Sequence, residues 1–362
     1  PEEAKETAYR IGLLLRSTNK VKRVLGSTRQ DINISIKGGE RIEIKGVQKL
    51  DWIPELVKFE IQRQKELIKI QTELQKRSIV ADEIKNDPVD VSPIFVQTPC
   101  KFVNSGIKRG LKLIALKFPQ MEGIFGHELY PNIRFGTEIS GKVKVLTNLK
   151  GLIHSDEELM KKYHFAAEEI TQLQNKLQIE KNDAFILLLA KGQPLETAID
   201  VIIGRVKKAF IGVPEETRQA NEDGTHVFLR ELGGEKRLYP DTDSPAILIS
   251  DEQLNHADKS KGDYPWDIMT KYAKKYDISE DQVETLIMDG NLPLFEKTIP
   301  IMPENPALVL HTIVEMVTVL RRDGKPVENL HESHFMSLLK AIKQDTVAKE
   351  AVDPILEYWT EH

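Results

Sequence analysis

One run of strictly alternating residues constrains the fold of this chain more than any other feature. Residues 31–36 read Asp-Ile-Asn-Ile-Ser-Ile, and the alternation resumes after two glycines in Arg41-Ile-Glu-Ile-Lys45. A period of two is typical of a strand with one buried face, and two such runs around Gly38-Gly39 predict a β-hairpin. The isoleucines of both runs can share one face only if the register keeps the two alternations in phase.

The register of this hairpin follows from that condition. A two-residue loop would place Ser35 opposite Ile42 and would mix polar with apolar side chains on both faces. A three-residue loop over residues 38–40 gives like-with-like pairs instead: Ser35 with Glu43, Asn33 with Lys45, and Ile34 with Ile44. We therefore predict this register, in which the isoleucines are buried.

The opposite face of the hairpin is the main candidate for chemistry. It carries two carboxylates, two cations, an amide and a hydroxyl, on Arg29, Asp31, Asn33, Ser35, Glu43 and Lys45. Such groups on a few pleats can bind a metal–phosphate and orient a carbonyl. The alternative is a solvent-facing hairpin whose cross-strand ion pairs each contribute under about 1 kcal/mol. The spacing alone leaves both interpretations open.

Size and composition predict a globular chain of several domains. It has 362 residues, of which 40% are hydrophobic and 30% charged, and domains usually hold roughly 100–200 residues each. The single cysteine, Cys100, excludes a disulfide scaffold and a multi-cysteine zinc site, and fits a reducing, cytoplasmic compartment. The longest apolar runs are short, as at Phe185–Ala190, so we expect no membrane span.

Periodicity and turn signals divide the chain into pieces. The first, up to residue 97, combines a helix over 2–16, the hairpin, and a long helix that Asp51 caps and that ends near Lys85. Residues 98–212 predict a compact α+β domain with strands at Leu111–Phe118, Lys142–Leu149 and Ala184–Ala190 and helices at Ala166–Leu177 and Leu195–Phe210. The fold class is therefore α+β and multidomain.

The secondary-structure signals change after residue 212. Residues 215–250 read as a short strand-and-turn segment, and beyond about residue 262 the pattern is all helical. The predicted helices there are Pro265–Tyr276, Glu280–Met288, Pro306–Arg322 and His334–Ala351 or beyond.

Charge is distributed unevenly around the formal net charge of −5. No acid lies between Glu6 and Asp31 or between Val91 and Met121, whereas residues 211–300 are strongly acidic. The net charge argues against a uniformly basic nucleic-acid binder, but local clusters decide phosphate binding because attraction is screened over about 8 Å.

Searches for familiar catalytic motifs find none. The sequence has no P-loop, no G-x-G-x-x-G, no G-x-S-x-G and no H-E-x-x-H. His331-Glu-Ser-His334 has the spacing of a metal pair, but we interpret it as a surface pair between a loop and a helix. The metal ligands are therefore unknown, and any use of ATP must proceed without a P-loop.

Several long stretches resemble the GatB/GatE family, which comprises the E subunit of the archaeal glutamyl-tRNA(Gln) amidotransferase and the B subunit of the bacterial-type enzyme. In the first piece they are residues 26–36, Arg41–Gln48 and Phe59–Gln64. Glu122–Ile139 looks like the insertion that distinguishes the archaeal branch and is similar to one in bacterial aspartyl-tRNA synthetases. Further matches are Gly212–Arg218, Asp223–Thr225 and residues 237–245.

The resemblance implies an architecture. Residues 1–97 and 213–262 would belong to a mixed α/β cradle, interrupted by the aspartyl-tRNA-synthetase-like insertion over 98–212 and followed by a helical domain and the start of a tail over 263–362. Family members begin with another half of the cradle, which holds metal-binding His and Glu residues. The chain starts at Pro1 without this half, and the tail stops at His362, so we expect the segment alone to be inactive.

The resemblance also implies a reaction, in which Glu-tRNA(Gln) is converted to Gln-tRNA(Gln). ATP with Mg²⁺ would phosphorylate the γ-carboxylate, and ammonia from a glutaminase/asparaginase-like D subunit would displace phosphate. Asp31 and Glu43 would lie near metal or ammonia, and Arg29 and Lys45 near phosphate or the tRNA 3′ end. Asn33 and Ser35 would orient the acyl group.

The implied partner is tRNA(Gln). Contacts with its phosphates are expected from the basic stretch over residues 10–29 and from Arg134. The candidate residues are Lys20, Lys22, Arg23 and Arg134.

Two other functions compete with this interpretation. A tRNA-binding adaptor without an active site would leave the polar face of the hairpin solvated. A synthetase-type module would need the class II motifs with their arginines, which the sequence lacks.

Overall fold

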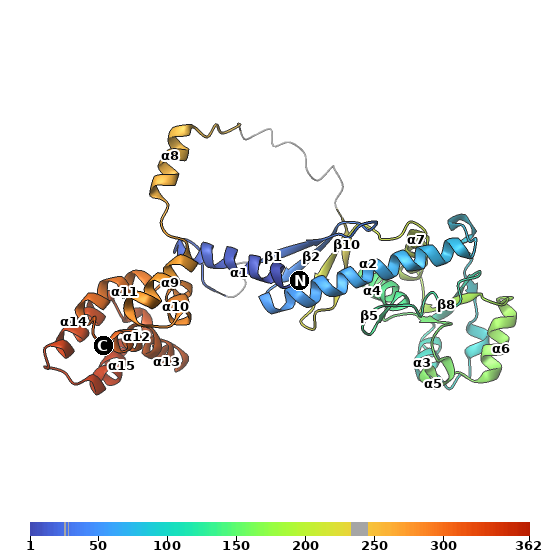
Figure 1. The fold of residues 1–362 in the computed structure, drawn as a ribbon. Helices are drawn as coiled ribbons and strands as arrows, with labels where there is room; N and C mark the ends of the chain where they lie inside the picture. Colours follow the sequence, from blue (N-terminus) through green and yellow to red (C-terminus); the bar gives the residue numbers. More distant parts are fainter. Residues whose placement is uncertain (25–26, 28, 233–244) are drawn as a thin grey trace. The chain divides into compact units, whose positions relative to one another are not determined.

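Within the chain, the computed structural model describes residues 1–24, 27, 29–232 and 245–362. Its contacts divide into two units (Figure 1). The first unit comprises residues 1–5 and 29–240, and the second residues 6–28 and 241–362. Most of the predicted motif over residues 237–245, with Gly26 and Thr28 of the first motif, lies outside the described residues.

The alternating residues form the first sheet of the first unit. The strands are β1 (Gln30–Ile34), β2 (Ile42–Val47), β9 (Glu216–Ala220) and β10 (His226–Glu231), in the order β1-β2-β9-β10. Both hairpins are antiparallel, and the central strands β2 and β9 pair in parallel. A segment that follows the hairpin by more than 150 residues therefore completes its sheet.

The predicted hairpin and its two faces are confirmed, but the predicted pairs are wrong. Asn33 pairs with Glu43 and Ile34 with Ile42, a shift of two residues from the expected register. The turn lies earlier than expected because the amide of Gly39 donates to the carbonyl of Ile36 at 2.9 Å and Gly38 adopts φ +80°, which glycine tolerates best. An even shift leaves every side chain on its predicted face.

A long helix, α2 (Ile53–Lys76), covers the buried face of this sheet. Asp51 does not cap it, because α2 follows a 3₁₀ turn over Leu50–Trp52 and the Asp51 carboxylate pairs with Lys5 at 2.6 Å. The helix also ends nine residues before the predicted Lys85. It stops at Lys76 because Ser78 turns the backbone into the left-handed region, at φ +57°.

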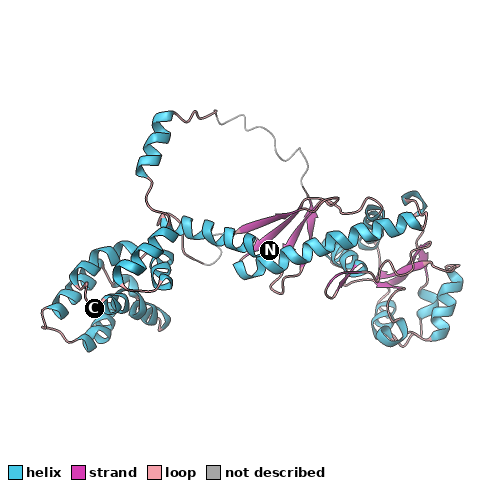
Figure 2. Ribbon diagram, viewed as in Figure 1, coloured by secondary structure: helices cyan, strands magenta, loops and turns pink. Residues whose placement is uncertain are grey.

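A second four-stranded sheet lies in the same unit (Figure 2). Its order is β3-β4-β8-β7, with antiparallel neighbours. The predicted strands near 111–118 and at 184–190 are confirmed. The strands are β3 (Val89–Asp90), β4 (Lys112–Phe118), β7 (Ile153–His154) and β8 (Ala184–Ala190), and a separate pair is formed by β5 (Glu128–Tyr130) and β6 (Ile133–Arg134).

Helices complete the first unit, and one of them replaces a predicted strand. Lys142–Leu149 was expected to be extended, but α4 (Phe135–Thr147) is a helix. The prediction is wrong because Lys142-Val-Lys-Val145 mimics a strand alternation, whereas Lys142 is buried and its Nζ lies 2.6 Å from Glu231 Oε1. The other helices are α3 (Lys101–Lys108), α5 (Leu159–Tyr163), α6 (Ala167–Lys176) and α7 (Gln193–Ala209).

The regular elements described in the second unit are all helices, as predicted for residues 263–362, but the helix predicted over His334–Ala351 ends at Lys343. Most of α1 (Glu2–Ser17) packs here, with Leu13 against Val283 and Ile287. The remaining helices are α8 (Asp251–Ser260), α9 (Pro265–Tyr276), α10 (Glu280–Asp289), α11 (Leu292–Thr298), α12 (Pro306–Leu310), α13 (Met316–Arg322), α14 (Glu332–Lys343) and α15 (Val352–Glu361). A π turn over His311–Glu315 joins α12 to α13. Among the helices described, none is long and apolar enough to cross a membrane.

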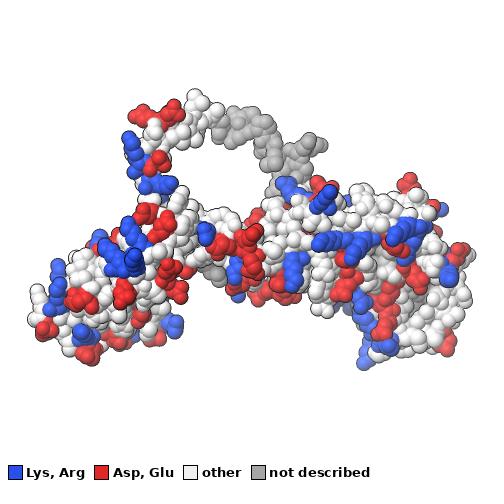
Figure 3. Space-filling model, viewed as in Figure 1, with Lys and Arg blue, Asp and Glu red and all other residues white. Residues whose placement is uncertain are grey.

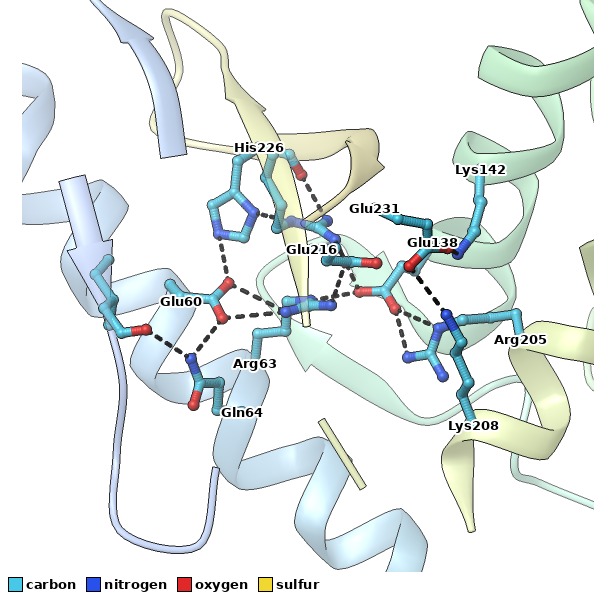
Figure 4. A network of polar contacts seen from close by, with 12 residues as sticks. Glu60, Arg63, Gln64, Glu138, Lys142, Arg205, Lys208, Glu216, His226 and Glu231 are labelled. Atoms are coloured by element: carbon cyan, nitrogen blue, oxygen red, sulfur yellow. Dashed lines mark hydrogen bonds and ion pairs between the residues drawn. The ribbon is translucent and has the colours of Figure 1, made fainter. Parts of the chain in front are cut away.

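A buried ionic network holds the elements of the first unit together (Figure 4). Its centre is Arg63 of α2, which is fully buried and donates to three glutamates from three elements. The distances are 3.0 Å to Glu60 in α2, 2.5 Å to Glu138 in α4 and 2.7 Å to Glu216 in β9. Gln64 donates to Glu60 at 2.8 Å and to the carbonyl of Ile34 in β1 at 3.4 Å.

Two further arginines balance the charge of these carboxylates. Arg205 of α7 donates to Glu138 at 2.6 Å, and Arg218 of β9 donates to Glu216. Three guanidinium groups therefore face three carboxylates, which burial requires because an unpaired charge in the interior is strongly unfavourable. Burial opposes ionisation of Glu138, but Arg63, Arg205 and Arg218 overcome it and hold its pKa well below the usual value.

His226 of β10 takes part as a neutral ring. Burial, then Arg218 and Arg63, lower its pKa well below the usual value. Its Nδ1 accepts from Nε of Arg218 at 2.7 Å, so Nε2 carries the hydrogen. Nε2 lies 3.5 Å from Oε2 of Glu60.

Replacing Arg63 by Met should destabilise the first unit by about 3–5 kcal/mol, because three buried carboxylates lose a shared partner. Hydrogen–deuterium exchange at the α2 amides reports the local opening free energy, and faster exchange is expected. Lys65→Met, an exposed change two residues away in the same helix, is the matched control. Equal protection in the two variants would contradict a stabilising role for the network.

Candidate active site

The outer face of the first sheet brings together three of the predicted site residues. Lys45 of β2 extends its ammonium group between two carboxylates, with Nζ 2.7 Å from Oδ2 of Asp31 and 3.0 Å from Oε1 of Glu43. The register shifts between Gln30 and Ile32, as in a β-bulge. Bulges change the direction of a side chain locally, and here Asp31 reaches Lys45 across the two strands.

Strand β9 adds two polar residues that the sequence analysis missed. Thr217 pairs with Glu43 in the parallel register and donates its hydroxyl to Oε2 of Glu43 at 3.2 Å. Gln219 pairs with Lys45 and donates to the Lys45 carbonyl at 3.4 Å. The signal was the polar spacing of Thr217 and Gln219 in one short strand, but nothing in the sequence says that β9 lies beside β2.

The other predicted residues lie around this cluster. Asn33 is exposed and pairs with Glu43 across the hairpin. Ser35 lies one residue beyond the end of β1, and Arg29 one residue before its start, and both are exposed. The structure thus joins Asp31, Glu43 and Lys45 directly and leaves the others at the edges of the same hairpin.

Two neighbouring carboxylates determine the electrostatics of Lys45. Hydrogen bonds to Asp31, and then to Glu43, raise the pKa of its ammonium group above the usual value. The stabilising contribution of this group is therefore complete below the pKa of the unfolded chain, and it is lost as pH rises through the higher folded value.

The expected Mg²⁺ does not fit the two carboxylates in this arrangement. The ammonium group of Lys45 already lies between Asp31 and Glu43, where a shared cation would bind. Across the described part of the chain, no group of three or more His, Cys, Asp and Glu side chains is placed to hold a metal ion. We therefore assign no metal ligand.

The predicted tRNA contacts fall in both units. Lys20 and Lys22 are exposed in the second unit, and Arg134 is exposed at the start of α4 in the first. Arg23 is engaged within the second unit, since it donates to the carbonyls of Met288 and Arg16 at 2.9 Å each. These donors neutralise the carbonyl ends of two helices, and a contact of Arg23 with tRNA stays a prediction.

Comparison with known proteins assigns the chain to a class. Residues 1–255 match the GatB/GatE catalytic domain. The match extends over more than half of the sequence, so the chain belongs to this family.

Individual relatives show which subunit of this family the chain resembles. The chain is 39% identical to a glutamyl-tRNA(Gln) amidotransferase E subunit of Pyrococcus furiosus, over all of its own length and 57% of that protein. It is 38% identical to the E subunit of Methanococcus maripaludis, again over its whole length and 57% of the relative. For the E subunit of Saccharolobus islandicus the identity is 38%, over 99% of this chain and 57% of that protein. The chain thus spans 57% of the length of these relatives.

The ion-paired state of Lys45 can be tested by titration. Asp31→Asn and Glu43→Gln should each lower its pKa toward 10.5, the ordinary lysine value, because each removes a hydrogen-bonded carboxylate. NMR titration of the Lys45 side chain measures the change. Glu40→Gln, in the exposed turn of the same hairpin, is the control and should leave the pKa raised. An unchanged pKa in the two test variants would show that the pairing does not persist in solution.

Proposed function

We propose that the chain is part of the E subunit of a glutamyl-tRNA(Gln) amidotransferase, which converts Glu-tRNA(Gln) to Gln-tRNA(Gln). The observation that carries the proposal is the match of residues 1–255 to the GatB/GatE catalytic domain, together with relatives of that name along the whole chain. The polar sheet face supports it, because the family match includes all four strands of this sheet.

The proposed chemistry explains why the candidate site has no nucleophile. A γ-carboxylate is a poor electrophile, so ATP first transfers its γ-phosphoryl group to a carboxylate oxygen and ADP leaves. Ammonia then attacks the carbonyl carbon of this acyl phosphate, the C–O bond to phosphate breaks, and the amide forms as phosphate leaves. Phosphoryl transfer depends mostly on positioning and on neutralising charge, for which an oriented cation is suited.

The residues of the hairpin take roles that fit their groups. Lys45 is held by two carboxylates and would offer its remaining N–H to the oxygens that carry negative charge during transfer. Glu43 or Asp31 would accept a proton from the attacking ammonia. Arg29 and Ser35 would contact the phosphates of ATP, and Asn33 would orient the acyl group.

The architecture and partners are part of the same proposal. Residues 1–97 and 213–262 are assigned to the cradle, 98–212 to the aspartyl-tRNA-synthetase-like insertion, and 263–362 to the helical domain. The second sheet supports a distinct insertion, although its edge strand β3 comes from residues 89–90. Ammonia would come from a glutaminase-type D subunit.

A second function, a tRNA-binding adaptor without chemistry, is favoured by one observation. The ion pairs of Lys45 with Asp31 and Glu43 are also those of an ordinary solvent-facing hairpin. The two functions predict different effects of removing the Asp31 or Glu43 carboxylate: turnover falls if the hairpin is catalytic and is unchanged if the chain is an adaptor.

Substitution in the full-length chain, assembled with its glutaminase partner, distinguishes them. Asp31→Asn and Glu43→Gln should each lower the rate of Gln-tRNA(Gln) formation by about 10²-fold or more, the usual range for removing a proton-transfer group. Binding of tRNA should be unchanged. The measurement is transamidation with preformed Glu-tRNA(Gln), ATP and glutamine.

Glu40→Gln serves again as the control, because it makes the same change of charge in the exposed turn of the hairpin. If all three variants retain the parent rate, the catalytic assignment of the hairpin is wrong and the adaptor function is supported.

A further inference from the structure

The outward face of α2 presents a row of lysines that the candidate site does not use. Among the residues of this helix, the exposed ones carry positive or neutral side chains: Lys58, Lys65, Lys69, Thr72, Gln75 and Lys76. The four lysines are spaced by seven, four and seven residues, so on an α-helix they lie within about 40° of one another around the axis. Figure 3 shows basic side chains along the course of α2. We call these four residues the lysine row.

The acidic residues of the same helix are less exposed than these lysines. Glu60 is buried in the ionic network, and Glu55, Glu66 and Glu73 are only partly exposed. Glu66 accepts from Lys69 at 2.7 Å and also pairs with His127 at 2.8 Å. Glu73 pairs with Arg77 at 2.9 Å. The exposed surface of α2 is therefore positive although the helix contains four acids.

The ammonium groups of the row remain available for another partner. Lys65 and Lys76 have no carboxylate within ion-pair distance among the residues that the structure describes. Among the described residues, Lys58 and Lys69 pair only with glutamates three residues earlier in the helix, and surface pairs with an exposed lysine contribute little. An external anion can therefore replace the glutamates at small cost.

A hollow of about 450 Å³ opens at the carboxyl-terminal end of the row. Lys69 and Lys76 line it, together with Thr72, Arg77 and His127. Arg77 is fixed there, since it donates to the carbonyls of Gln120 and Glu122 at 2.9 and 2.8 Å. The lining also includes Glu73 and three isoleucines, so the row leads into a concave surface whose charged side chains are three cations and one carboxylate.

We propose that the lysine row and this hollow bind the phosphate backbone of a folded RNA along α2. From Lys58 to Lys76 the row spans about 27 Å at 1.5 Å per residue, which covers several successive phosphates. Regularly spaced lysines suit sequence-independent contact with the backbone, because ammonium groups neutralise phosphates whatever the bases are. Double-stranded RNA in particular is recognised through its shape and phosphates.

This inference rests on the proposed function, in which the RNA is tRNA. It adds a contact surface in the first unit that is separate from Lys20, Lys22, Arg23 and Arg134. An acidic protein partner is the other occupant that such a charge pattern would accept, and the experiment distinguishes the two.

The test changes all four lysines of the row to Gln in the full-length chain. Unacylated tRNA(Gln) is titrated at several salt concentrations, and the slope of log K against log salt is measured. Removing four phosphate contacts should reduce the magnitude of the slope by about three units and weaken binding about tenfold or more at 0.1 M salt. Single Lys65→Gln and Lys76→Gln variants should each reduce it by about one unit, which guards against misfolding of the quadruple variant.

The matched control changes four exposed lysines that lie on different elements of the same unit, namely Lys161, Lys176, Lys181 and Lys191. This control has the same change in net charge and should keep a slope close to that of the parent.

Three results would count against the inference, each in a distinct way. Equal slopes for the row variant and the scattered control would overturn it while leaving the proposed function intact. Loss of the glutaminase partner in gel filtration, with tRNA affinity unchanged, would identify a protein-docking surface instead. Failure of the parent chain to bind tRNA would contradict the proposed function itself.

Discussion

The first unit depends on one guanidinium group. Arg63 contacts Glu60, Glu138 and Glu216, which belong to a helix, a second helix and a strand far apart in the sequence. An apolar core would tolerate small shifts of these elements, but a buried ion network is stabilising only when every charge is paired. The network therefore specifies how α2, α4 and β9 meet. The sheet that carries Asp31 and Glu43 takes its position from this arrangement.

The two faces of the sheet illustrate how much the sequence determines. The alternation of isoleucine with polar residues predicted the hairpin and the face that carries Asp31, Glu43 and Lys45. The pairing of Asn33 with Glu43 could not be predicted, because two registers that differ by an even number of residues bury the same side chains. Thr217 and Gln219 were missed for another reason, since no local pattern reports that two distant strands are neighbours.

Two of the wrong predictions, the strand at Lys142–Leu149 and the cap at Asp51, have a common physical cause in charge pairing. Lys142 and Glu138 are of residue types that usually face solvent, yet both are buried because oppositely charged groups from other elements pair with them. A helix whose buried side includes charged residues has no visible apolar stripe, so α4 resembled a strand. Asp51 similarly fits a helix cap by type, but its carboxylate contacts Lys5.

The parallel pairing of β2 with β9 affects how the chain is made. Glu43 and Thr217 are 174 residues apart, so the hairpin leaves the ribosome long before its central neighbour is synthesised. At about 5–20 residues per second, the delay is roughly 10–35 s. A two-stranded ribbon is at best marginally stable during such an interval, and its unpaired edge can accept a foreign strand. The edge of residues 42–47 that β9 later covers is therefore open to such pairing until β9 is synthesised.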